Sequence, residues 1–156
     1  MRNELSSAIL IVDSREPWPH PWAAYLPDGL TLARGTLETG DIALAALPDA
    51  AVIERKTIRD LLACIGRERE RFERELKRSR YVGRFLVIVE GTLCELLDAP
   101  SGIHNNAIIG TLAAWQRRYA PFCFAGNIST AARIGEAFLC GQVREIQRAA
   151  KLLKAA

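Results

Sequence analysis

The chain has 156 residues, of which 49% are hydrophobic and 25% charged, as in an average globular domain and unlike a disordered or collagen-like chain. We expect one domain over residues 1–156, with its motifs at about residues 8–90 and a C-terminal helical part at about residues 100–156. No apolar run approaches the roughly 20 residues that cross a bilayer. The N-terminus lacks the pattern of a signal peptide, so we expect a soluble, cytoplasmic protein.

Positive charge is concentrated in two segments. Residues 54–84 and 115–156 each carry a net charge of +5 and together hold 18 of the 21 lysine and arginine side chains. Residues 1–53 and 85–114 are net acidic. Two interpretations are open. The basic segments are solvated helix faces, or they bind phosphate beside a carboxylate-rich centre, which suits an enzyme acting on nucleic acid.

The first third of the chain predicts short strands joined by loops. Apolar or alternating runs indicate strands at residues 8–12, 30–34 and 41–47, and at 50–53 leading into Glu54. Three prolines at positions 17, 19 and 21 predict a loop between the first two strands. Trp18 and Trp22 lie in this loop. We expect them to pack the loop onto the core, and the alternative is that they stack on exposed bases.

The rest of the chain predicts helices alternating with strands. Thr57 is the expected N-cap of a helix that Gly66 interrupts, followed by a charged helix over residues 67–80. Residues 85–90 read as a central parallel strand and 121–125 as a short one. Further helices are predicted at residues 103–119, 130–139 (with Ser129 as N-cap) and 142–153. The order predicts an α/β fold, a central mixed sheet with helices on both faces.

Cysteine and histidine offer no obvious chemistry. The four cysteines are widely spaced, without a CxxC pair, so we expect unreactive thiols and no zinc site. His20 and His104 have no nucleophile at a matching spacing, and we expect them in solvent-exposed or loop positions.

Acidic residues gather at the ends of the predicted strands. These are Asp13 and Glu16, then Asp41, then Glu54. Carboxylates held together repel each other, and Mg²⁺ is a simple compensation because it needs few protein carboxylates. Lys56 lies two residues after Glu54, so on a strand both side chains point to the same face. The pattern predicts a metal-nuclease site, and surface charges at strand ends are the alternative.

Three ordered motifs carry a family resemblance. Residues 12–16 read V-D-x-R-E, residues 40–41 read G-D, and residues 54–60 read E-R-K-x-x-x-D. This order resembles the nuclease domain of the XPF/Hef family of structure-specific endonucleases, which carries an ERCC4-type domain. Gly66-Arg67, the strand at residues 85–90 and the helix segment at residues 115–119 extend the similarity to roughly residues 8–140.

The resemblance implies a restriction-endonuclease-like core that depends on Mg²⁺ or Mn²⁺. It makes Asp41 and Glu54 the metal ligands, Lys56 the catalytic lysine, and Asp13 and Glu16 further acidic residues of the catalytic site. A water activated at the metal and oriented by Lys56 would attack the phosphodiester in line.

Supporting residues are expected around this site. Arg15 and Arg55 either contact phosphate or hold the carboxylates by charge-assisted hydrogen bonds. Asp60 either helps the site or caps the helix that follows Thr57. From charge, we expect DNA binding by three arginines of the basic helix, Arg67, Arg69 and Arg71.

The expected function is metal-dependent hydrolysis of DNA, at branched sites or at junctions of single strand and duplex. One alternative is a catalytically silent DNA-binding subunit of a nuclease heterodimer, although the intact Asp41, Glu54 and Lys56 argue against it. Another is a restriction-like enzyme that reads duplex sequence. Helicase or helix-hairpin-helix modules, usual in the family, have no counterpart in these residues, which leaves the preferred DNA structure open.

The resemblance and the C-terminal pattern also predict a homodimer through the C-terminal helices. Five apolar residues are expected to supply the surface: Ile134, Phe138, Val143, Ile146 and Leu153.

Overall fold

The computed structural model describes residues 8–155, and its centre is a six-stranded sheet in the order β2-β1-β3-β4-β5-β6. The strands are β1 (Ile9–Asp13), β2 (Thr31–Gly35), β3 (Ile42–Leu44), β4 (Val52–Lys56), β5 (Phe85–Val89) and β6 (Phe122–Phe124). β3 runs antiparallel to both of its neighbours, and the other pairs are parallel. The predicted mixed sheet and its buried parallel strand, β5, are therefore confirmed.

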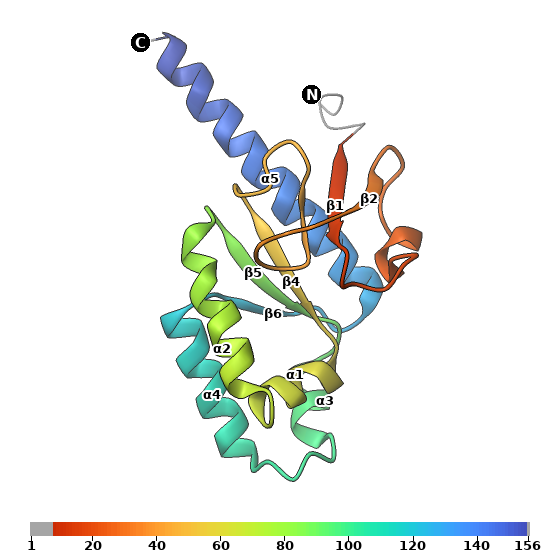
Figure 1. Ribbon diagram of the computed structural model, residues 1–156, viewed down its shortest axis with the longest axis vertical. Helices are drawn as coiled ribbons and strands as arrows, with labels where there is room; N and C mark the ends of the chain where they lie inside the picture. Colours follow the sequence, from red (N-terminus) through yellow and green to blue (C-terminus); the bar gives the residue numbers. More distant parts are fainter. Residues whose placement is uncertain (1–7, 156) are drawn as a thin grey trace.

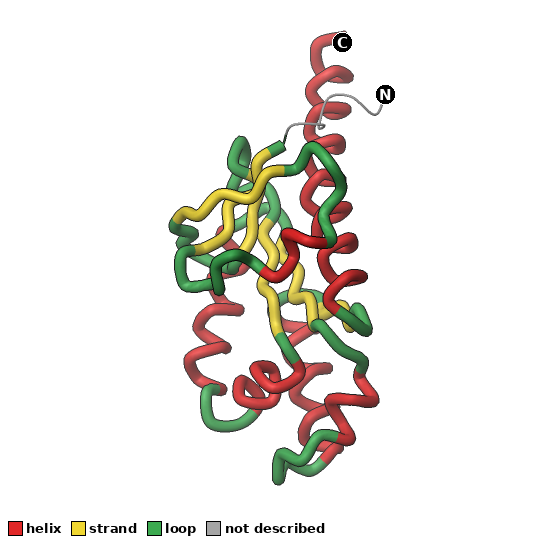
Figure 2. Tube along the Cα trace, turned by 90° about the vertical axis from the view of Figure 1, so that its right-hand side faces the viewer, coloured by secondary structure: helices red, strands yellow, loops and turns green. Residues whose placement is uncertain are grey.

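Helices cover both faces of the sheet (Figures 1 and 2). They are α1 (Ile58–Ile65), α2 (Arg69–Arg78), α3 (Leu93–Asp98), α4 (Asn105–Arg118) and α5 (Ile128–Ala155), with 3-10 helices η1 (Pro21–Ala24) and η2 (Ser79–Tyr81). Helices α1 to α4 contribute to one buried cluster and α5 to the other. No helix within residues 8–155 combines the length and the apolar character needed to cross a membrane.

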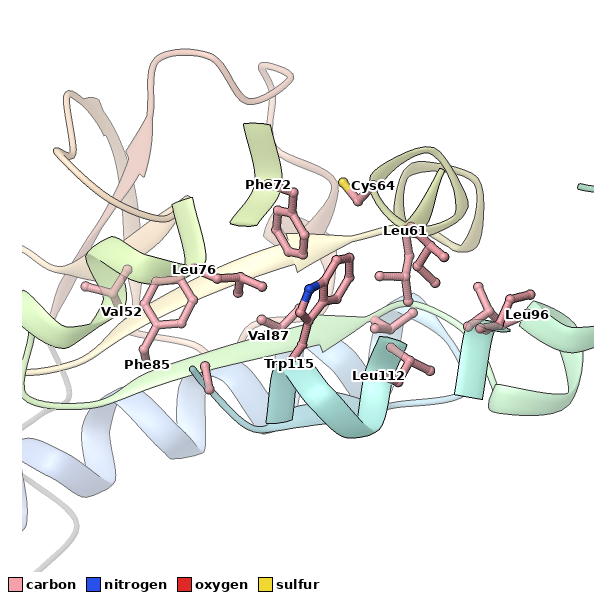
Figure 3. Close-up of a cluster of buried hydrophobic side chains, with 14 of the residues drawn as sticks. Val52, Leu61, Cys64, Phe72, Leu76, Phe85, Val87, Leu96, Leu112 and Trp115 are labelled. Carbon is pink, nitrogen blue, oxygen red and sulfur yellow. The ribbon is translucent and has the colours of Figure 1, made fainter. Parts of the chain in front are cut away.

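Side-chain alternation along β5 divides the hydrophobic core into two layers. Val87 and Val89 enter the cluster beneath α1 to α4, whereas Leu86 and Ile88 enter the cluster beneath α5. Trp115 lies in the first cluster, where its ring meets Phe72 edge to face at a centroid distance of 5.2 Å (Figure 3). Helices packed on both sides hold the sheet and its strand ends in place.

The proline loop after β1 packs onto α5 through Trp22. This side chain is 1% exposed, and a Cβ built on Gly135 of α5 would lie 2.5 Å from its ring. Gly135 thus provides the space that the indole occupies. The expected packing of the loop is confirmed for Trp22 but is wrong for Trp18, whose side chain is 46% exposed. The loop also contains a short helix, η1, which begins at Pro21.

The C-terminal region is one helix, and the predicted break near Gly141 is absent. Leu139, Cys140 and Val143 around Gly141 are buried against the core. This burial offsets the roughly 1 kcal/mol that a glycine costs inside a helix. Asn127, rather than Ser129, caps the first turn, because its Oδ1 accepts the N–H of Thr130 at 2.8 Å.

A short helix, α3, was not predicted. Its Thr92 and Glu95 form a capping box, in which each side chain accepts a backbone N–H of the other residue. This local hydrogen bonding lets six residues form a helix between β5 and α4.

Candidate active site

Three neighbouring strands bring the acidic motifs to one edge of the sheet. The N–H of Asp13 donates to the carbonyl of Asp41 at 2.8 Å, and the N–H of Asp41 donates to the carbonyl of Ile53 at 2.8 Å. Gly40 precedes Asp41 with φ of +73°, and a Cβ there would lie 2.2 Å from Cγ1 of Val52. The turn that delivers Asp41 therefore requires glycine, which is the structural reason for the G-D motif.

Strand β4 places Glu54 and Lys56 on the same face, as predicted. The Nζ of Lys56 lies 2.5 Å from Oε1 of Glu54, and both side chains are nearly buried. With Asp41 and Glu16 they line a cavity of about 170 Å³. The intervening Arg55 points to the other face.

Asp41 and Glu54 are two carboxyl groups of this cavity whose ionised forms are disfavoured. Burial, and then the charge of Glu54, raise the pKa of the Asp41 carboxyl well above its usual value. Burial also raises the pKa of Glu54, although the neighbouring Lys56 opposes the rise. A site that disfavours the ionised form of two carboxyl groups gains by binding a cation.

Lys56 keeps its proton in this environment. Burial alone would lower its pKa, but the carboxylates of Glu54 and Asp41 outweigh burial and raise it. The ammonium also lies 4.9 Å from the centroid of the Phe72 ring, a cation–π contact. The ammonium of Lys56 is therefore placed where it can orient a nucleophile or stabilise a charged phosphate.

Glu16 is held at the cavity by a buried polar network. Nη1 of Arg55 donates to Oε2 of Glu16 at 3.1 Å, and Nε and Nη2 of Arg55 donate to Glu90 at 2.6 and 2.8 Å. The indole N–H of Trp22 donates to Glu90 at 2.6 Å. Although burial opposes it, hydrogen bonding from His20 and the charge of Arg55 lower the pKa of Glu16. Arg55 therefore holds two carboxylates, one of the two roles expected for it.

His20 lies in the proline loop, one of the two positions expected for it, but its side chain is buried. It is 2% exposed because the proline loop folds back onto α5. Its Nδ1 accepts the N–H of Trp22 at 3.2 Å, so in the neutral ring Nε2 carries the proton and donates to Glu16 at 3.3 Å. His104, by contrast, caps α4 by accepting the N–H of Asn106.

Asp13, expected among the catalytic residues, is not one of the described residues that line the cavity, and its contacts stabilise the fold instead. Its carboxylate is 1% exposed and accepts the N–H of Leu37 at 2.8 Å, the N–H of Arg15 at 3.0 Å and Nε of Arg15 at 2.5 Å. Burial opposes ionisation, but these hydrogen bonds lower the pKa of Asp13. Arg15 thus holds a carboxylate while its side chain stays 65% exposed beside the cavity.

Asp60 serves as part of a helix cap. Its carboxylate accepts the hydroxyl of Thr57 at 2.7 Å, and its N–H donates to the same hydroxyl at 3.2 Å. It is exposed and is not among the described residues that line the cavity. The geometry favours the capping role over the catalytic one.

The three arginines expected to bind DNA lie in different surroundings. Arg71 lines the cavity and pairs with Glu68 and Glu75. Arg69 turns to α4, where it donates to Thr111 at 3.0 Å and packs on the Trp115 ring at 5.6 Å. Arg67 is 79% exposed. Arg69 and Arg71 point in nearly opposite directions because they are two residues apart on a helix, and Arg67 precedes that helix.

Sequence reasoning missed Glu75 and Arg78, which line the cavity, and Glu90, which binds Arg55 on the opposite face of the sheet. Glu75 and Arg78 follow Arg71 at helical spacings of four and seven residues, so the polar stripe of α2 was a usable signal. Glu90 follows β5 directly, which is the same strand-end signal that singled out Asp13 and Asp41.

The donor set suits a hard cation with few protein ligands. Within residues 8–155, no group of three or more His, Cys, Asp or Glu side chains forms a complete metal site. Asp41 and Glu54 are two facing carboxylates with raised pKa values. Mg²⁺ binds in this manner, through one or two carboxylates with water and substrate phosphate completing its shell.

Comparisons with known proteins agree with this architecture. XPF from Aeropyrum pernix aligns with a TM-score of 0.63 and 21% identity, covering 84% of this chain and 59% of that one. XPF from Aeropyrum pernix in complex with DNA aligns with a TM-score of 0.66 and 19% identity, covering 88% and 66%. These likenesses confirm the expected fold, and the chain spans less than two thirds of either structure.

The search of curated proteins gives no match. Among protein families, the ERCC4 domain matches residues 12–133, which contain all three motifs. This span is most of the chain, and the chain therefore belongs to the ERCC4 domain family.

Proposed function

We propose that this protein is a metal-dependent endonuclease that hydrolyses DNA phosphodiester bonds. One observation carries the proposal. A cavity in an ERCC4 domain brings together two carboxyl groups, Asp41 and Glu54, and the ammonium of Lys56, whose Nζ lies 2.5 Å from Oε1 of Glu54. The shared fold with an XPF that was solved in complex with DNA supports DNA as the substrate.

Each residue has a distinct task in this proposal. Asp41 and Glu54 would hold Mg²⁺ or Mn²⁺, which neutralises phosphate charge and promotes attack by water. Lys56 donates hydrogen bonds to the attacked phosphate or orients the water through its ammonium. Glu16 adds a third carboxylate to the cavity beside Asp41 and Glu54, and a hydrogen bond from Arg55 holds it there. Arg71 and Arg15, half exposed or more at the rim, bind flanking phosphates.

Two substitutions test the assignment. Asp41→Asn removes one strong ligand and should lower cleavage in Mg²⁺ by about a hundredfold to a thousandfold, the usual loss for one transition-state stabiliser. DNA binding in EDTA should persist or tighten, because a carboxylate facing phosphate repels it. Lys56→Ala should also cripple cleavage yet leave metal affinity largely intact. Cleavage by Asp41→Asn at the wild-type rate in Mg²⁺ would refute the assignment of this site.

Branched DNA, or a junction of single strand and duplex, is the proposed substrate form. The family resemblance supports it, and cleavage of labelled duplex, fork, flap and four-way junction would test it. Equal rates on all four would exclude structure-specific cleavage.

We also propose that two copies pair through the end of α5. Its C-terminal part extends beyond the rest of the molecule (Figures 1 and 2), and Ile146, Leu152 and Leu153 are 38%, 73% and 81% exposed. Of the five residues first expected to pair, Val143 is instead buried, and Ile134 and Phe138 pack on the core. Light scattering should give a dimer that the double substitution of Leu152 and Leu153 to serine dissociates. A wild-type monomer at micromolar concentration would refute pairing.

A further inference from the structure

Trp18 is an exposed aromatic side chain two residues after Glu16, which lines the candidate active site. It is 46% exposed, whereas the other two tryptophans, Trp22 and Trp115, are each 1% exposed and packed in the core. Leaving a large aromatic ring in water has no benefit for folding. An exposed tryptophan beside a nucleic-acid site is suited to stack on a base.

The residues around Trp18 restrict its position and place a positive charge against its ring. Prolines at positions 17 and 19 restrict the backbone on both sides of it. The guanidinium of Arg34, on β2, lies 5.9 Å from the ring centroid, and its Nη2 donates to the carbonyl of Ser14 at 2.6 Å. The ring is therefore pre-organised, which lowers the entropy lost on binding.

Trp18 is also close to the cavity along the chain. Glu16 lines the cavity, and Trp18 is two residues further on. Two residues span at most about 7 Å between Cα atoms. Stacked nucleotides rise about 3.4 Å each, so the ring lies within reach of a base a few nucleotides from a phosphate in the cavity.

We propose that Trp18, with Arg34 against its ring, binds an unpaired base of the DNA strand that enters the candidate active site. The inference rests on the proposed function and assigns a residue to its substrate preference. An unpaired base exposes a whole face for stacking, whereas bases inside a duplex are already stacked on their neighbours. Arg15 and Arg34, both exposed, supply positive charge for the adjoining phosphates.

Tryptophan fluorescence in EDTA provides a direct test. Because Trp22 and Trp115 are buried, quenching by a bound base reports on Trp18. Titration with a short oligo(dT) should quench emission, and a blunt duplex of equal length should quench it little. Trp18→Phe should bind oligo(dT) almost as well and give no comparable quenching, since the remaining tryptophans are shielded.

Affinity measured by anisotropy separates stacking from general loss of binding. Trp18→Ala should weaken oligo(dT) binding by about 5- to 100-fold, the range for losing one stacked base. Its duplex affinity should stay within about twofold of wild type. Tyr25→Ala is the matched control, because Tyr25 follows in the same segment and is 41% exposed. Tyr25→Ala should change neither the affinity for oligo(dT) nor the affinity for duplex DNA.

Three results would overturn the inference. These are unquenched emission at saturating oligo(dT), wild-type oligo(dT) affinity in Trp18→Ala, and equal losses on oligo(dT) and duplex. Circular dichroism checks folding, and Trp18→Phe keeps the test valid if Trp18→Ala does not fold. The assays need no metal and no cleavage, so failure of the proposed nuclease activity would be seen separately.

Discussion

Asparagine at position 41 should stabilise the metal-free protein even as it removes activity. Burial, and then the charge of Glu54, raise the pKa of the Asp41 carboxyl well above its usual value. A carboxyl with a higher pKa in the folded state binds its proton more tightly there. Its contribution to stability is complete below the unfolded pKa of about 4, and it is lost as pH rises through the folded pKa.

The size of the gain follows from this linkage. Asparagine keeps an oxygen that can accept the N–H of Arg55, which Oδ2 of Asp41 accepts at 2.7 Å, so the turn should persist. Each tenfold change in proton affinity between folded and unfolded states is worth about 1.4 kcal/mol. A gain of that size raises Tm by about 3–6 °C in a domain of this length.

Thermal unfolding in EDTA at pH of about 5 and 8 measures the effect. The Tm advantage of Asp41→Asn over wild type should be larger at the higher pH. Glu38→Gln, an exposed carboxylate nearby, is the control and should show no such trend. Mg²⁺ should reduce the Tm difference between Asp41→Asn and wild type, because it should stabilise the wild type alone. A lower Tm for Asp41→Asn at pH 8 would refute the proposed charge repulsion.

Four further predictions concern two supports of the cavity, Gly40 and Glu90, and two arginines of α2, Arg71 and Arg69. Gly40→Ala should cost about 1–3 kcal/mol of stability in urea unfolding and reduce cleavage, since its φ is +73° and the space is filled. Glu90→Ala should cost about 3–5 kcal/mol, because Arg55 loses its bidentate partner. Arg71→Ala should weaken DNA binding and lower the salt slope by about 0.9. Arg69→Ala should mainly lower stability, since its side chain packs on α4.

Local patterns predicted much of the fold correctly. The hydroxyl of Thr57 caps α1 as the sequence indicated, and β5 is buried along its whole length. Helix and strand periodicity require only neighbours in the chain, so a sequence is enough to show them. The same holds for Glu54 and Lys56, whose shared face follows from strand alternation.

The errors arose where distant segments decide the outcome. Gly141 predicts a helix break when its segment is considered alone. In the fold, burial of its neighbours against the core keeps α5 continuous. The loop position expected for His20 is correct, but its burial arises because the proline loop meets α5, a contact over more than 100 residues. Arg69 and Arg71 carry the same charge, but Arg69 contacts α4 whereas Arg71 lines the cavity. No local pattern specifies such contacts.

The E-R-K tripeptide, residues 54–56, makes contacts on both faces of the sheet. Strand alternation sends Glu54 and Lys56 into the cavity on the α2 side and Arg55 to the opposite side, where Glu90 binds it. Arg55 also reaches Glu16, so the acidic wall of the cavity is tied to the layer that α5 and Trp22 form. A neutral side chain at position 55 would leave two buried carboxylates without their cation. The middle residue of the motif therefore positions a carboxylate of the candidate site from the opposite face of the sheet.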